Sequence, residues 1–244
     1  MSTDKNLPLN YNRWQIFSDV AQVERAAERE ITAAAQHALK RRGVFHLVLT
    51  GGNTPRPIYE ALCTIETDWD RWQIWFGDER CLPPEDSQRN SRIASETWLD
   101  HVAIPPDNIH PIPSERGPQA AADIYAGLLA AVPIFDLVLL GLGEDGHVAS
   151  LFPGASWHVK SDLPAVLPVF DSPKAPAQRV SLSPARLSAA RKVLFIIVGA
   201  GKRNAVNKWR AGNSIPASSI TPAAGVDIYV DVAAYGNEVQ IGSD

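Results

Sequence analysis

The stretch 135–147, FDLVLLGLGEDGH, joins an uninterrupted apolar run to a glycine-rich turn. A short apolar run bounded by turn residues is typical of a strand buried on both faces of a parallel sheet. Val44–Leu49, Ile74–Phe76 and Val193–Val198 repeat this order, and each also runs into a turn that contains glycine. We therefore expect four such strands, with Phe135–Leu140 as one of them.

Helical patterns separate these runs. Ser18–Arg42 carries apolar residues at helical spacing and is followed by Gly43, a typical helix stop, and a second helical pattern runs through Ile58, Leu62 and Ile65. Alternating strands and helices predict the α/β class, a doubly wound, mainly parallel sheet with helices on both faces. We expect one domain over residues 1–244, with the proline-rich stretches Leu82–Glu85, Ile104–Pro113 and Leu163–Pro176 as loops within it.

Composition excludes several classes of protein. The chain has 244 residues and a net charge of -4, which argues against nucleic-acid binding because such proteins present a basic face. Cys63 and Cys81 are too few for a disulfide framework and lack the spacing of a zinc site. Met1–Asn10 is polar, and no apolar run approaches the roughly 20 residues of a membrane span. We expect a cytoplasmic protein.

The glycine turns predict where a ligand binds. Ligands of open parallel sheets lie beyond the carboxyl ends of the strands, so all four turns are expected to converge on one crevice. Gly141–Gly146 formally fits the GxGxxG dinucleotide pattern. However, Glu144 and Asp145 would face the pyrophosphate, and Pro153 cuts the following helix short. A dinucleotide site is therefore disfavoured.

Asp145-Gly146-His147 is the more informative part of that turn. A carboxylate two residues from an imidazole can orient the ring and raise its basicity, while the second ring nitrogen stays free. The alternative is that Asp145 caps a helical turn and His147 packs in the interior. The place of His147 at a strand end favours a chemical role.

Two further turns predict an anion site. Gly51, Gly52, Asn53 and Thr54 offer backbone amides and a hydroxyl, although the same residues also fit a tight turn with Thr54 as helix cap before Pro55. Lys202 follows a glycine-rich turn at a helix start and can meet a phosphate as a point charge. A nucleotide P-loop is rejected, because Ile196 and Arg203 stand where it requires glycine and Ser or Thr.

The remaining candidate residues are less specific. Arg179 opens an alternating segment, RVSL, and is a second candidate cation, with a solvated arginine at a strand end as the alternative. Asp78, Arg80 and Asn90 offer polar groups to the same crevice, although an internal salt bridge would explain them equally well. Trp69, Trp72 and Trp75 read as core residues. No cluster has metal-ligand spacing.

Together the turns resemble those of the 6-phosphogluconolactonase family, whose fold is shared with glucosamine-6-phosphate deaminases. The matching motifs occur in the family's order, and the third is the most specific: LTGGNTP at 49–55, WFGDER at 75–80, GLGEDGHVASLFPG at 141–154, and RVSLS at 179–183 with Gly201-Lys202. Departures are Asn53 where serine is usual and Val148 where threonine is usual. After His147 the chain continues ASLFPG, like the lactonases, whereas deaminases tend to carry Asn-Glu-Pro there.

The resemblance implies that His147 is the general base and that Asp145 supports it. It also implies that the Gly51–Thr54 loop, Arg179 and Lys202 hold a substrate phosphate, while Asp78, Arg80 and Asn90 shape the sugar side. The expected reaction is hydrolysis of 6-phospho-D-glucono-1,5-lactone in the pentose phosphate pathway, without metal or organic cofactor.

Two rivals stay open. One is a phosphosugar deaminase or isomerase with Asp78 as base. The other is a sugar-phosphate sensor domain, disfavoured because no DNA-binding helix pair precedes the domain.

Overall fold

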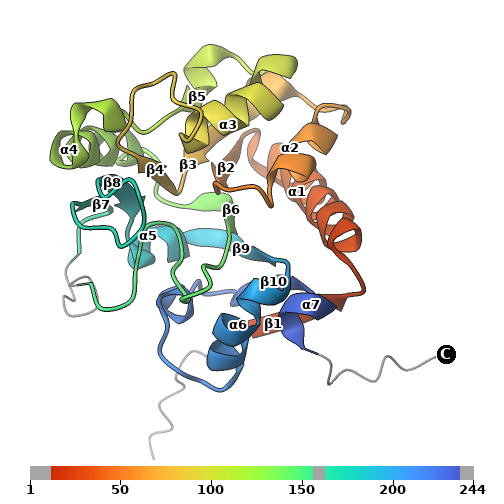
Figure 1. Ribbon diagram of the computed structural model, residues 1–244. Helices are drawn as coiled ribbons and strands as arrows, with labels where there is room; N and C mark the ends of the chain where they lie inside the picture. The colour runs from red at the N-terminus through yellow and green to blue at the C-terminus, as the bar shows by residue number, and fades with distance from the viewer. Residues whose placement is uncertain (1–11, 156–162, 237–244) are drawn as a thin grey trace, which may run out of the picture.

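A parallel sheet of seven strands forms the centre of the computed structural model, which describes residues 12–155 and 163–236 (Figure 1). Its strand order is β1-β10-β9-β6-β2-β3-β5, and all neighbouring strands are parallel. The strands are β1 (Asn12–Phe17), β2 (Phe45–Leu49), β3 (Trp72–Phe76), β5 (Ile109–His110), β6 (Phe135–Leu140), β9 (Ala190–Ile197) and β10 (Val226–Asp231). The four predicted strands are β2, β3, β6 and β9, and the mainly parallel α/β fold is confirmed.

Helices cover both faces of this sheet. Its helices are α1 (Val20–Arg42), α2 (Arg56–Leu62), α3 (Asn90–Thr97), α4 (Pro118–Leu129), α5 (Pro184–Ser188), α6 (Arg203–Arg210) and α7 (Val232–Tyr235). The Tyr229 hydroxyl donates to Glu30 of α1, whereas Phe195 packs edge-on against Trp209 of α6. Tyr229 pairs across the strands with Ile196, the neighbour of Phe195, so these two aromatic side chains point to opposite faces.

Burial explains why the central strands could be predicted. All six residues of β6 are buried, as are all six of β10. At the start of α1, Asp19 Oδ1 accepts the backbone N–H of Gln22, and Gly43 ends the helix with a φ of 74°. The end at Gly43 agrees with the predicted stop, whereas the helix begins at Val20, with Asp19 as its N-cap, rather than at Ser18.

A second, antiparallel sheet lies beside the first. Its order is β4-β8-β7, from β4 (Asp78–Arg80), β7 (Val166–Val169) and β8 (Arg179–Leu182). The loop predicted over Leu163–Pro176 is therefore wrong in part, since it contains β7. Proline has no backbone N–H to donate, and Pro168 is tolerated there because β7 is an edge strand that pairs with a neighbour on one side only. The loop predicted over Ile104–Pro113 likewise contains the short β5.

The start of α2 also differs from the prediction. Pro55, not Thr54, is the N-cap, no side chain caps the helix, and Pro57 lies in its first turn. A proline fits there because the first-turn N–H groups have no partner within the helix. The helix ends at Leu62 rather than reaching Ile65.

Among the described residues, no helix combines the length and apolar character needed to cross a bilayer. The polar segment Met1–Asn10 lies outside the described residues.

Candidate functional site

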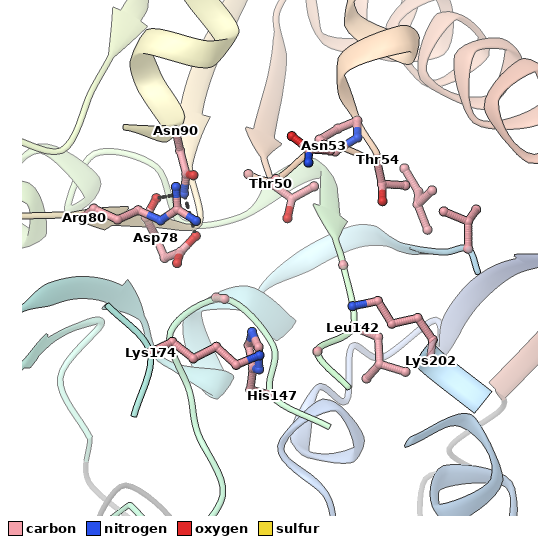
Figure 2. Close-up of a pocket in the computed structure, with 18 of the residues that line it drawn as sticks. Thr50, Asn53, Thr54, Asp78, Arg80, Asn90, Leu142, His147, Lys174 and Lys202 are labelled. Atoms are coloured by element: carbon pink, nitrogen blue, oxygen red, sulfur yellow. Dashed lines mark hydrogen bonds between the residues drawn. The ribbon is translucent and has the colours of Figure 1, made fainter. Parts of the chain in front are cut away.

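A cleft of about 410 Å³ opens where β2, β3, β6 and β9 end (Figure 2). All the predicted site residues line it except Asp145, which lies behind His147. The lining consists of Thr50, Gly51, Gly52, Asn53, Thr54, Pro55, Asp78, Arg80, Asn90, Gly141, Leu142, Gly143, His147, Ala149, Lys174, Arg179, Ile196, Val198 and Lys202. The structure thus brings the four predicted glycine-bearing segments to one place, although Asp78–Arg80 is the strand β4 and not a turn.

The carboxylate of Asp145 holds the imidazole of His147 through one ring nitrogen. His147 Nδ1 lies 2.5 Å from Asp145 Oδ1, and the same oxygen accepts the backbone N–H of His147 at 3.2 Å. The imidazole ring also contacts Phe152, with ring centroids 4.7 Å apart. The ring orientation is therefore fixed from two sides, and Nε2 is left for the cleft.

Two glycines allow this loop to close so tightly. A Cβ on Gly143 would lie 1.9 Å from His147 Nδ1 and 2.6 Å from Asp145 Oδ1, so only glycine fits against the pair. Gly146 has a φ of 90°, and a Cβ there would meet Ile215 at 3.0 Å. The glycines that suggested a nucleotide loop thus serve the contact between Asp145 and His147.

Electrostatics favour the neutral imidazole. Burial lowers the pKa of His147 below its ordinary value, and the opposing influence of Asp145 does not fully offset burial. For Asp145, burial raises the pKa, but the hydrogen bond and charge of His147 outweigh it and the pKa lies below the ordinary value. At neutral pH the pair is therefore a carboxylate beside a neutral imidazole with a free basic nitrogen.

Asp78 is buried on the opposite wall and both of its carboxylate oxygens are engaged. Oδ1 accepts the side-chain N–H of Asn90 at 2.9 Å, and Oδ2 accepts the Ser150 hydroxyl at 2.6 Å. Ser150 is brought there by Ala149, which adopts a positive φ of 48°. The internal salt bridge considered as an alternative for this segment does not involve Asp78 among the described residues.

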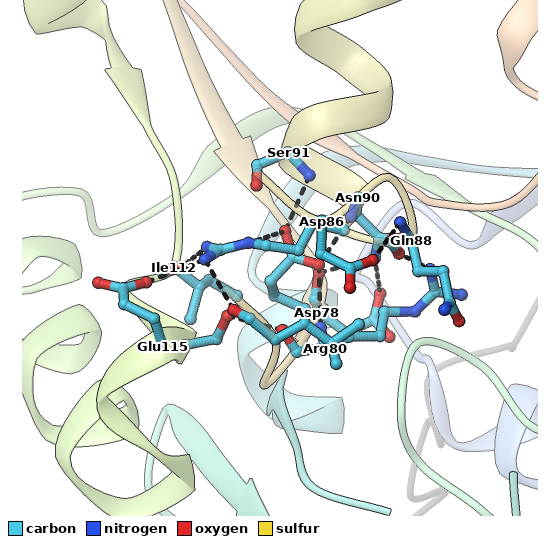
Figure 3. Close-up of polar contacts among 12 residues, drawn as sticks. Asp78, Arg80, Asp86, Gln88, Asn90, Ser91, Ile112 and Glu115 are labelled. Carbon is cyan, nitrogen blue, oxygen red and sulfur yellow. Dashed lines mark hydrogen bonds and ion pairs between the residues drawn. The ribbon is translucent and has the colours of Figure 1, made fainter. Parts of the chain in front are cut away.

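The ion pair of this segment lies one residue further along, at Glu79. This carboxylate is fully buried, lies 3.7 Å from Arg89 Nε, and accepts the backbone N–H groups of Arg80, Asn90 and Ser91 (Figure 3). Arg89 donates in turn to Glu115 and to the carbonyls of Leu82 and Ile112. Glu79 thus fixes the start of α3, and with it Asn90, against β4.

The Gly51–Thr54 loop and Lys202 face each other across another part of the cleft (Figure 2). A Cβ on Gly51 would lie 1.9 Å from Asn90 Oδ1, which explains the glycine and shows how closely this loop packs on Asn90. Lys202 is half-buried at the start of α6, and burial lowers its pKa despite the opposing charge of Glu144. Because Thr54 caps no helix, its hydroxyl is available to the cleft.

Lys174 is a lining residue that sequence reasoning missed. It lies in the β7–β8 loop, which we had interpreted only as a proline-rich connection, and its side chain reaches the neighbourhood of His147 in Figure 2. Arg179, by contrast, is buried rather than solvated at its strand end, and its guanidinium donates to carbonyls of the Lys174 loop. Proximity in sequence to Arg179 was the available signal for Lys174.

The balance of charge suits an anionic ligand. Among the residues that the structure describes, Arg80, Lys174, Arg179 and Lys202 line the cleft, against the single lining carboxylate of Asp78. Within residues 12–155 and 163–236, no three His, Cys, Asp or Glu side chains are grouped so that they could hold a metal ion. The fold and the site together define a class: a doubly wound α/β protein with an acid–imidazole pair beside a cationic cleft.

Comparison with known proteins gives the family. The pattern of the glucosamine-6-phosphate isomerases/6-phosphogluconolactonase family matches residues 18–229. The 6-phosphogluconolactonase of Streptomyces coelicolor is 40% identical over 75% of this chain and 76% of its own length. The enzyme of that name from Mycobacterium leprae is 36% identical over 86% of this chain and 90% of its own length. The chain belongs to this family, and within it to the 6-phosphogluconolactonases, as the sequence motifs predicted.

Solved structures agree on the fold. The 6-phosphogluconolactonase of Trypanosoma brucei superposes with a TM-score of 0.84 at 26% identity, covering 94% of this chain and 99% of that one. A monomeric glucosamine-6-phosphate deaminase gives a TM-score of 0.77 at 20% identity, covering 91% and 98%. The second likeness concerns the fold alone.

Proposed function

We propose that this chain hydrolyses 6-phospho-D-glucono-1,5-lactone to 6-phosphogluconate, as part of the oxidative pentose phosphate pathway. The observation that carries the proposal is the Asp145–His147 pair, joined at 2.5 Å, on the wall of a cationic cleft. The names of the relatives, at 35–40% identity, support the same substrate.

His147 acts as the general base in this proposal. Because Asp145 accepts the Nδ1–H, Nε2 carries the lone pair and takes a proton from water as the water oxygen bonds to the lactone carbonyl carbon. The carbonyl π electrons move to the oxygen. The resulting tetrahedral oxyanion then re-forms its C=O bond and breaks the ring C–O bond, and the imidazolium returns the proton to the departing ring oxygen. The new carboxylic acid loses its proton to solvent.

The phosphate provides orientation in this mechanism. The Gly51–Thr54 loop and Lys202 would hold it at a distance from His147, so binding energy from a non-reacting group fixes the carbonyl near the base. Asp78, Arg80 and Asn90 would line the sugar hydroxyls. No step requires a metal or organic cofactor.

The sequence ASLFPG after His147 and the names of the relatives favour a lactonase over a deaminase or isomerase. Asp78, the candidate base of that rival reaction, accepts hydrogen bonds from Asn90 and Ser150. Glucosamine 6-phosphate is therefore the control substrate for the assay.

The test is to assay the purified chain with freshly generated 6-phosphogluconolactone and, separately, with glucosamine 6-phosphate. We expect accelerated release of acid from the lactone and no release of ammonia from the amino sugar. Ammonia release without lactone hydrolysis would overturn the proposal.

The phosphate site has its own test in Lys202→Ala. Loss of the ammonium group should raise KM for the phosphorylated lactone by roughly 10-fold to 100-fold, as loss of a charged hydrogen bond of about 1.5–3 kcal/mol implies. Hydrolysis of unphosphorylated D-glucono-1,5-lactone should change little. Equal losses on both lactones would contradict a phosphate role for Lys202.

A further inference from the structure

The β7–β8 loop brings a cation to the reacting end of the cleft. Lys174 is exposed, lines the cleft, and ends beside His147, whereas Lys202 reaches into the middle of the cleft from the start of α6 (Figure 2). The two lysines therefore enter the cleft from different elements. The loop itself is held by Ser172, whose Oγ donates to the Lys174 carbonyl at 2.8 Å and accepts the Lys174 N–H at 3.2 Å.

The guanidinium of Arg179 donates hydrogen bonds to the backbone of this loop. Its Nε donates to the Pro176 carbonyl at 3.1 Å, and its Nη2 donates to the carbonyls of Ala175 at 2.9 Å and Lys174 at 3.3 Å. The side chain is also buried, and its guanidinium lies 5.6 Å from the centre of the Phe152 ring. These contacts indicate that the main role of Arg179 is to fix the backbone that carries Lys174, and not to bind a phosphate.

Four backbone amides of the His147 loop already have acceptors within the loop and are not free to form an oxyanion site. The amide of Gly143 donates to the His147 carbonyl at 2.8 Å and that of Gly146 to the Gly143 carbonyl at 2.9 Å. The amides of His147 and Val148 donate to Asp145 Oδ1 and to the Leu151 carbonyl. These four donors are committed within the loop, so a side-chain cation beside His147 is a strong candidate to stabilise the oxyanion.

We propose that Lys174 is a catalytic residue, whose ammonium group donates a hydrogen bond to the lactone carbonyl oxygen as this oxygen becomes an oxyanion. Arg179 is the positioning residue that holds the Lys174 loop in place. The inference rests on the proposed lactone hydrolysis. Lys174 stays protonated throughout, and the proton of the attacking water passes to His147 and then to the ring oxygen.

The charges around His147 provide a readout that a structural role for Lys174 would not move. Asp145 and Asp78 raise the pKa of the imidazole, whereas burial and the charge of Lys174 lower it. The charges of Glu144 and Asp145 likewise raise the pKa of Lys202, whereas the charge of Lys174 lowers it. Removing the Lys174 charge therefore raises the pKa of His147, and the base form is lost at a higher pH.

The central test is Lys174→Gln, with Lys208→Gln as matched control. Lys208 is an exposed lysine in the last turn of α6, outside the cleft lining. We expect Lys174→Gln to lower kcat by about 10²-fold to 10³-fold, the range for loss of one oxyanion donor, on phosphorylated and unphosphorylated lactone alike. The acid limb of its kcat/KM profile should move to higher pH. Lys208→Gln should retain wild-type kinetics.

Arg179→Lys tests the positioning role, because it keeps the charge and loses the planar fork. It should lower kcat on both lactones, and the double variant with Lys174→Gln should be little worse than Lys174→Gln alone. A rise in KM confined to the phosphorylated lactone, for either single variant, would overturn the inference by placing that residue at the phosphate.

Two outcomes separate this inference from the proposed function. A wild-type chain that hydrolyses neither lactone would overturn both. An active wild type with a folded Lys174→Gln variant of unchanged kcat, its fold checked by circular dichroism, would overturn the role of Lys174 alone.

Discussion

At the scale of single residues, the pair formed by Asp145 and His147 is the part of the proposed mechanism that sets its pH range. Burial lowers the pKa of His147 and Asp145 raises it, with burial the larger influence. The base form therefore persists below the ordinary histidine pKa of about 6.5. We expect the acid limb of kcat/KM to report a pKa lower than that value. A limb clearly above it would contradict the assignment of His147 as base.

Asp145→Asn should separate the two influences. It removes the charge that raises the pKa of His147, so the acid limb should move to still lower pH. It also removes the acceptor that fixes the ring nitrogen, and kcat should fall on the order of 10²-fold to 10⁴-fold. A pH–rate profile measures both. An upward move of the limb would show that Asp145 does not act through the imidazole.

Gly143→Ala offers a steric test of the same pair. The new Cβ would overlap His147 Nδ1, at 1.9 Å, so the ring or the loop must shift. A displacement of this size should lower kcat by about 10²-fold, as misplacing a reacting group does. Gly127→Ala in α4, where a Cβ meets nothing within 4 Å, is the control and should leave kcat unchanged. Unchanged kinetics in Gly143→Ala would contradict the tight packing of this loop.

Local patterns made some of these residues predictable and hid others. Asp145 and His147 are two positions apart in one turn, so their contact could be proposed from the sequence. The contacts of Glu79 with Asn90 and Ser91 span eleven and twelve positions, and the approach of Lys174 to His147 depends on a hairpin of the second sheet. Without the fold, nothing in the sequence joins these residues.

At the scale of elements, the junction of β4 with α3 carries Asp78, Arg80 and Asn90, the side chains proposed to line the sugar. Arg89 is buried and pairs with Glu79, whereas Arg92, one turn further along α3, forms an exposed pair with Glu96. Arg89→Ala should lower the free energy of unfolding by about 3–5 kcal/mol, because it leaves a buried carboxylate without its partner. Arg92→Ala, the matched control, should cost less than about 1 kcal/mol. Urea unfolding measures both, and equal losses would contradict the role of the Glu79–Arg89 pair.

Elements were predictable where burial leaves a simple pattern. The strand Phe135–Leu140 is buried at every position and was predicted to the residue. Short strands at sheet edges, such as Ile109–His110 and Val166–Val169, lie among prolines and are fixed by tertiary pairing rather than local preference.

At the scale of the whole molecule, parallel strands bring the segments 50–55, 78–80, 141–147 and 199–202 to one edge of the sheet. A ligand that contacts several of these turns should stabilise the entire fold. At about 100 times its Kd, 6-phosphogluconate should add about 2.7 kcal/mol and raise Tm by roughly 5–10 °C.

Gluconate without the phosphate is the control ligand for that measurement, and Lys202→Ala is the control protein. Both should show a much smaller rise in Tm at the same concentration. An equal rise with gluconate would mean that the phosphate contributes nothing to binding.

The most direct test of the whole account is single-turnover or steady-state hydrolysis of freshly generated 6-phosphogluconolactone by the wild type and by His147→Ala. We predict that kcat of the variant falls by at least about 10²-fold, the contribution of a general base, while the protein remains folded. A His147→Ala variant with wild-type kcat would contradict the central claim that this imidazole activates the attacking water.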